Sequence, residues 1–236
     1  MKKLLKVAVN DFRLVFRDNS LKFFILLPLM NLLVLRYGLP SVLGIFPVLG
    51  DYVPYIVMLI TVQGAVGFGF IYSMVLVDEK DTYVAKVYGV LPISQFWFVN
   101  FRLTAPFLLA TLATFLLLLA DPFHKISIPA NLFYSALTGL ITPQMVLFVA
   151  IMAKNKIEAM TWQKLFNLPV TLPILAFFVP AKLGFLFAVL PTHWAFQGFN
   201  KLIAGEGFTL YFATGFIYSL ILVGLFARRF SKVHFS

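Results

Sequence analysis

The sequence of 236 residues contains no cysteine, which excludes disulfide frameworks, thiolate metal sites and cysteine nucleophiles together. Charge is scarce as well. Only 12% of the residues are charged, with 9 acidic residues against 19 Lys and Arg, whereas soluble domains average about 25%. A soluble fold could not bury the apolar surface of a chain that is 61% hydrophobic and has a mean hydropathy of +0.94.

The sequence also lacks the residues of an intramembrane active site. His124, His193 and His234 lie far apart, outside the clearest apolar runs, and no Asp or Glu lies centrally in such a run. Paired carboxylates, nucleophile–base pairs and metal clusters are therefore not expected. No Gly-x-x-x-x-Gly-Lys-Ser/Thr phosphate loop occurs either. We expect a protein that is not an enzyme, binds no metal or cofactor, and relies on another chain if ATP drives it.

Long apolar runs dominate what is present, and a bilayer core needs about 20 such residues for each helix. The period-two alternation of a membrane β-barrel is absent. The sequence predicts an all-α membrane protein, a single domain over residues 1–236. Its six transmembrane helices are expected at residues 21–39, 52–77, 99–120, 130–153, 162–180 and 208–227.

Two segments are predicted to lie at or near the membrane surface. Over residues 1–20, basic residues and apolar residues follow separate helical stripes, which predicts an amphipathic interfacial helix. Residues 182–207 are long enough for a seventh span but contain several Gly, Pro and polar residues. We predict an external re-entrant hairpin over residues 183–190, followed by an interfacial helix around Trp194–Ile203.

Charge placement decides between six and seven spans. With six spans and both termini inside, only Arg36, Lys125, Lys182 and Lys201 lie outside. The inner side then holds Lys2, Lys3, Lys6, Arg13, Arg17, Lys22, Lys80, Lys86, Arg102, Lys154, Lys156, Lys164, Arg228, Arg229 and Lys232. This distribution obeys the positive-inside rule, and a seventh span would break it. We expect a multi-pass protein of the plasma (inner) membrane with both termini cytoplasmic.

Small and polar residues within the spans indicate how the helices pack. Gly64, Ala65, Gly67 and Gly69 give the second span a face of small residues, which is typical of close helix packing. Arg36 is a charge inside the first span. It is either an anchor that reaches the outer interface, a partner for Asp51, or a candidate contact for an anionic group on a substrate.

The polar segment after the second span carries an ordered pattern. An acidic residue, Glu79, is followed by Thr82 and then by the run Pro92-Ile93-Ser94. A second polar segment reads Asn155-Lys156-Ile157-Glu158-Ala159 and leads into a proline-bearing fifth span. A third pattern, Leu190-Pro191-Thr192-His193, follows the predicted external hairpin.

The order of these patterns resembles the type-2 ABC transporter permease family, and most of all its small drug and fluoroquinolone export permeases. The resemblance covers nearly the whole chain. Two residues and one short segment depart from the family pattern: Asp81 replaces the usual Gly before Thr82, Ala159 replaces Gly, and Asn100-Phe101-Arg102 replaces Gly-Lys. The spacing between Thr82 and Pro92 is about two residues longer than is typical.

The resemblance implies a transport subunit without its own ATPase site. Two permeases, as a homodimer or heterodimer, would each dock a cytosolic ABC ATPase subunit that binds ATP and Mg. Residues 78–92 would form the cytoplasmic coupling segment. Its expected contacts are Glu79, Thr82, Tyr83, Val84, Val87 and Tyr88, with Asn155, Lys156 and Glu158 in the second cytoplasmic loop.

Within the coupling segment, Tyr83 with Val87 and Val84 with Tyr88 form i, i+4 pairs that could fill a groove. The acidic residues Asp78, Glu79 and Asp81 would lie on its rim with Lys86. The alternative interpretation of this segment is a solvated turn between spans.

The sequence therefore predicts the transmembrane permease subunit of an ATP-driven exporter. Its substrates would be hydrophobic or amphipathic small molecules, drugs included, and its partners the ATPase, a second permease and the lipid membrane, with no nucleic acid. Two alternatives stay open: an ATP-independent carrier or channel, and a non-transporting membrane scaffold.

Overall fold

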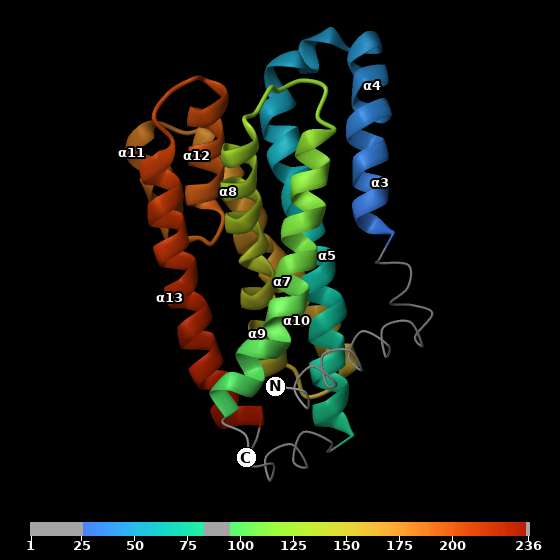
Figure 1. Ribbon diagram of the computed structural model, residues 1–236, viewed down its shortest axis with the longest axis vertical. Coiled ribbons are helices and arrows are strands. Elements are labelled where there is room, and N and C mark those ends of the chain that lie inside the picture. The colour runs from blue at the N-terminus through green and yellow to red at the C-terminus, as the bar shows by residue number, and fades with distance from the viewer. Residues whose placement is uncertain (1–25, 83–94, 235–236) are drawn as a thin grey trace.

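The computed structural model describes residues 26–82 and 95–234, and within these ranges every regular element is a helix (Figure 1). The first half contains α3 (Leu27–Leu33), a π-helical turn η1 (Val34–Gly38), α4 (Leu39–Ile45), the 3-10 turn η2 (Pro47–Tyr52), α5 (Val53–Asp81) and α7 (Gln95–Leu119). The second half contains α8 (Ile128–Gly139), α9 (Ile141–Met152), α10 (Lys156–Thr171), η3 (Leu172–Phe177), α11 (Ala181–Gly184), η4 (Phe185–Val189), α12 (His193–Ile203) and α13 (Thr209–His234). The predicted interfacial helix over residues 1–20 lies outside the described residues.

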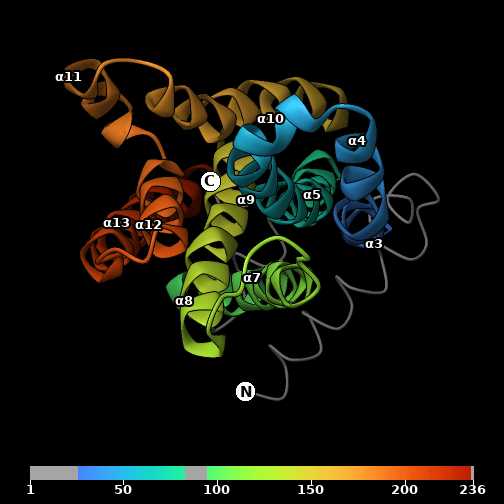
Figure 2. The same cartoon turned by 90° about the horizontal axis from the view of Figure 1, so that it is seen from above.

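Five helical stretches are long and apolar enough to cross a bilayer. They are Leu27–Ile45, Pro47–Asp81, Phe98–Leu119, Ile128–Met152 and Thr209–Val233. These stretches confirm the all-α membrane class and coincide with five of the six predicted spans. The other predicted span, residues 162–180, falls mainly on α10 and η3. Figure 2 shows α10 lengthwise while α5 and α7 are seen end on, so α10 is steeply inclined to the bundle. The six-span arrangement stays a prediction.

Prolines explain where several helices are interrupted. Pro143 has no N–H to donate to the carbonyl of Gly139, and the predicted fourth span is divided at this point into α8 and α9. In the first span, Pro40 follows the π-helical turn, in which the backbone N–H of Leu39 donates to the carbonyl of Val34, five residues back. The fifth predicted span changes to 3-10 geometry at Leu172, next to Pro173.

The core lies where α5 packs against α9. A Cβ atom at Gly69 would lie 2.8 Å from Sδ and 3.1 Å from Cβ of Met145, so a larger residue there would displace the Met145 side chain. One turn away, the hydroxyl of Thr142 donates to the carbonyl of Ala65 at 2.9 Å. These contacts confirm that the small-residue face of α5 serves close helix packing.

The predicted external region folds against α13. A Cβ at Gly198 would overlap the ring of Phe212, and a Cβ at Gly215 would lie 3.0 Å from Cβ of Trp194. Later residues of α12 therefore contact earlier residues of α13, so the two helices run antiparallel, as Figure 1 shows. The helix predicted around Trp194–Ile203 is present as α12, whereas its interfacial position and the re-entrant path before it stay predictions.

Candidate functional site

Charged side chains from four helices gather at one end of the bundle. It is the end where α5 stops and α7 begins, at the bottom of Figure 1. We call it the polar end and define it by residues at the end of α5, the start of α7, the end of α9 and the start of α10. The defining residues are Asp78, Glu79, Lys80, Arg102, Ala153, Asn155, Lys156 and Glu158. The last turns of α13 also reach this end.

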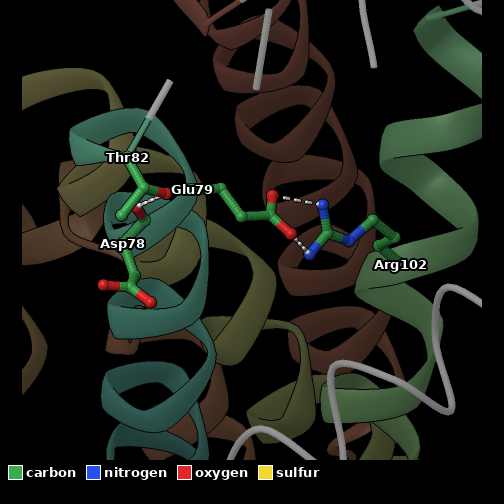
Figure 3. Close-up of polar contacts among 4 residues, drawn as sticks. All are labelled: Asp78, Glu79, Thr82 and Arg102. Atoms are coloured by element: carbon green, nitrogen blue, oxygen red, sulfur yellow. Dashed lines mark hydrogen bonds and ion pairs between the residues drawn. The ribbon is translucent and has the colours of Figure 1, made fainter. Parts of the chain in front are cut away.

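A buried ion pair joins α5 to α7 (Figure 3). Nη1 of Arg102 donates to Oε2 of Glu79 at 2.7 Å, and Nη2 donates to Oε1 at 2.8 Å. The side chains are only 4% and 7% exposed, respectively. The guanidinium also lies 5.3 Å from the ring centre of Phe98. Two parallel charge-assisted hydrogen bonds fix both the distance and the relative orientation of the two helices.

The apolar surroundings of this pair come from three helices. Leu76 of α5, Leu103 of α7 and Phe230 of α13 line a small cavity together with Arg102. Because such a site offers few water contacts, the two charges stabilise each other. Glu79 lies in the last turn of α5 and Arg102 in the third turn of α7, so the pair joins the two helices that flank residues 83–94.

Lys80 ties the same end of α5 to α9. Its Nζ donates to the carbonyl of Ala153 at 2.8 Å and to that of Ala150 at 3.4 Å. These carbonyls belong to the C-terminal end of α9, where the helix dipole favours a cation.

The start of α10 is held by its own cap and by Asp78. The backbone N–H of Glu158 donates to Oδ1 of Asn155 at 2.9 Å, and the carboxylate of Glu158 accepts from the backbone N–H of Lys154. Nζ of Lys156 lies 2.9 Å from Oδ1 of Asp78, with both side chains 44% exposed. The structure thus brings the second predicted loop, with Asn155, Lys156 and Glu158, next to the end of α5.

The predicted coupling residues fall into two groups. Tyr83, Val84, Val87 and Tyr88 lie outside the described residues. Thr82 is exposed, and its hydroxyl donates to the carbonyl of Asp78 at 2.7 Å, which closes the last turn of α5 (Figure 3).

Glu79 differs from its expected place on the rim of a groove. It is buried, because α5 continues to Asp81 and turns this carboxylate towards α7. Sequence reasoning did not identify Arg102 as its partner. A usable signal existed, since Arg102 is the one cation between Lys86 and Lys125.

Arg36 stands apart from the polar end. It is exposed within the π-helical turn of the first span, and no ion pair with Asp51 forms among the described residues. Within residues 26–82 and 95–234, no three His, Asp or Glu side chains gather closely enough to hold a metal ion.

Comparisons with known proteins cover almost the whole chain. The family model described as fluoroquinolones export permease protein Rv2686c-like matches residues 11–227. Two curated relatives are the fluoroquinolones export permease proteins MT2760 and Rv2686c, from the CDC 1551 / Oshkosh and H37Rv strains of Mycobacterium tuberculosis. Each is 22% identical over 240 residues, which cover 95% of this chain and 92% of the relative. No solved structure matches the chain significantly.

Proposed function

Since the chain belongs to the family of Rv2686c-like fluoroquinolone export permeases, which are ABC-type exporter permeases, we propose that it is the transmembrane subunit of an ATP-driven exporter. A separate cytosolic ATPase chain binds ATP and Mg and hydrolyses the nucleotide. Two permease chains pair to form the pathway, and the cargo is a hydrophobic or amphipathic compound of the drug type named for the relatives.

The family match carries this proposal, and the buried Glu79–Arg102 pair supports its coupling part. Burying each charged group costs roughly several kcal/mol of hydration free energy, so a buried ion pair adds little net stability. A pair of this kind has its best-attested use in fixing the geometry of the elements it joins. Here it fixes the two helix ends that flank residues 83–94, so a partner that binds this segment acts on a rigid base.

The other polar contacts extend this base to the rest of the bundle. Lys80 attaches α5 to the end of α9, and Asp78 attaches it to the start of α10. A displacement of the coupling segment therefore moves four helices together rather than one loop. Exchange of such packed elements between two arrangements is a common basis of switching, here between inward-facing and outward-facing states.

The polar end is the cytoplasmic end in this proposal. Lys80, Arg102, Lys154 and Lys156 lie there, and so does the end of α13 with its basic residues. The positive-inside rule assigns such an end to the cytoplasm. Residues 83–94 then face a cytosolic ATPase, and the C-terminus is on the same side.

Truncation of the two tyrosines in the coupling segment tests the proposal. Tyr83→Ala with Tyr88→Ala should abolish co-purification of the ATPase, because buried aromatic anchors at interfaces contribute about 2 kcal/mol or more each. The matched control is Tyr37→Ala with Tyr52→Ala, two exposed tyrosines outside the polar end. Both variants should insert into the membrane at the wild-type level.

Two results would overturn the proposal. One is unchanged ATPase binding and transport in the Tyr83/Tyr88 variant. The other is transport by the purified permease alone, in liposomes without ATP, which would make the protein a carrier.

A further inference from the structure

A cavity of about 680 Å³ lies at the end of the bundle opposite the polar end. It is enclosed by the end of η3, by α11 and η4, by α12 and by the first turns of α13, and it is open to the surface on one side. Its volume is within the range of about 300 to 1,000 Å³ that is usual for pockets that bind small molecules. The side chains that determine its chemistry are Phe177, His193, Trp194, Gln197, Tyr211 and Thr214.

Hydrogen bonds hold the start of α12 in place beside this cavity. The hydroxyl of Thr192 donates to the carbonyl of Val170 at 2.6 Å, and Nε1 of Trp194 donates to the carbonyl of Ala188 at 3.1 Å. The indole of Trp194 also lies 6.4 Å, between ring centres, from the ring of Tyr211. Two aromatic rings on different helices thus stand in the wall of a preformed cavity.

His193 is the unusual residue in the wall. It is only 5% exposed, and its Nδ1 has no hydrogen-bond partner among the described residues. A buried polar atom without a partner destabilises a protein, so such atoms are rare in stable proteins. Burial lowers the pKa of His193, and the neutral ring has one nitrogen that donates and one that accepts. Nδ1 itself has almost no accessible surface, so a molecule in the cavity would contact His193 through the part of the ring that lines the cavity.

We propose that the cavity binds an uncharged aromatic small molecule, which hydrogen-bonds to His193 and packs against Trp194 and Tyr211. The described lining residues include no Asp, Glu, Lys or Arg, so a charged group would find no counter-ion there. Gln197 and Thr214 supply further hydrogen-bond donors and acceptors. That this binding is a step in export rests on the proposed function. The binding itself requires only the permease.

Protection of an introduced cysteine measures this binding in the permease alone. Thr214→Cys places a thiol in the wall of the cavity, and Ala213→Cys is the matched control because Ala213 lines a different pocket on α13. The chain has no other cysteine to react. Both variants are purified in phosphatidylcholine–phosphatidylglycerol nanodiscs and labelled with a maleimide, with and without Nile red, an uncharged aromatic dye. At ten times its Kd, the dye should slow labelling of Thr214→Cys about tenfold, because it leaves one site in eleven empty.

A second pair of variants tests the role of His193 in the Thr214→Cys background. His193→Phe keeps an aromatic ring without the nitrogens and should raise the Kd of the dye by roughly two- to tenfold. His193→Gln retains both a donor and an acceptor and should bind more tightly than His193→Phe. Gln197→Leu replaces His193→Phe if the latter does not fold, and should also raise the Kd.

Three results would overturn the inference. They are equal protection of Thr214→Cys and Ala213→Cys, an unchanged Kd in the His193→Phe and Gln197→Leu variants, and a thiol at position 214 that reacts in detergent but not in lipid without dye. The last result would mean that an acyl chain fills the cavity. Because no ATPase is present, these outcomes do not depend on whether an ATPase binds residues 83–94.

Discussion

Breaking the Glu79–Arg102 pair from one side should destabilise the protein far more than removing both charges. Glu79→Gln removes the carboxylate charge that pairs with the guanidinium of Arg102, and Arg102→Met removes the guanidinium that pairs with the carboxylate. Removal of one partner of a buried pair costs about 3–5 kcal/mol. Replacement of both partners by neutral side chains of similar volume is often close to neutral. The Glu79→Gln/Arg102→Met double variant should therefore recover most of the lost stability.

Thermal unfolding in detergent, followed by tryptophan fluorescence, measures this difference. For a chain of this size, 1 kcal/mol corresponds to about 2–4 °C in Tm, so each single variant should unfold roughly 6–20 °C below the wild type. Asp78→Asn is the matched control, one position away on α5. Its pair with Lys156 is 44% exposed on both sides and should contribute at most about 1 kcal/mol.

A Tm for Glu79→Gln that equals that of Asp78→Asn would refute the reasoning, since it would mean that the pair is hydrated. Transport assays of the double variant then separate stability from coupling. If the pair fixes the base of the coupling segment, this variant should fold and yet lose ATP-driven transport. Full transport would restrict the pair to a structural role.

Three further predictions address topology, substrate charge and helix packing. Ser231→Cys should react with an impermeant thiol reagent only after cells are permeabilised; reaction in intact cells would contradict a cytoplasmic C-terminus. Arg36→Gln should reduce export of acidic compounds more than of neutral ones if Arg36 contacts substrate, and an equal loss for both would identify it as a membrane anchor. Gly198→Ala should destabilise the protein by about 1–3 kcal/mol in thermal unfolding, because its Cβ overlaps the buried ring of Phe212. Gly224→Ala, with no side chain within 4 Å of the new Cβ, should not lower Tm.

Hydropathy located most of the helices because the bilayer sets their length and composition. The starts of α5 and α13 fall within one residue of the predicted spans, at Val53 and Thr209. Their ends differ, because charge marks where a chain meets water rather than where a helix stops. The second span was expected to end at Val77, whereas α5 continues to Asp81.

The ion pair could not be derived from sequence spacing. Spacing shows which residues share a face of one helix, and Glu79 and Arg102 lie on different helices, 23 positions apart. Their contact depends on how α5 and α7 pack around the connecting segment. When its partner is not known, a glutamate close to Asp78 and Asp81 is most simply interpreted as exposed. This interpretation missed the ion pair between α5 and α7 at the polar end.

The cavity was equally hidden from the sequence, and for a related reason. Its walls form only because α10 gives way to η3 beside Pro173 and because α12 turns back along α13. Neither event has a signal in hydropathy, which treats residues 182–207 as an ambiguous apolar stretch. The two ends of the bundle consequently differ in chemistry: the polar end pairs its charges across helices, whereas the described wall of the cavity contains only neutral groups. If the protein has the proposed function, this difference assigns attachment of the ATPase and binding of the substrate to opposite ends of the bundle. A charged, rigid end suits attachment to an ATPase, and an uncharged aromatic cavity suits a compound that must leave for the membrane or the medium without a tightly bound counter-ion.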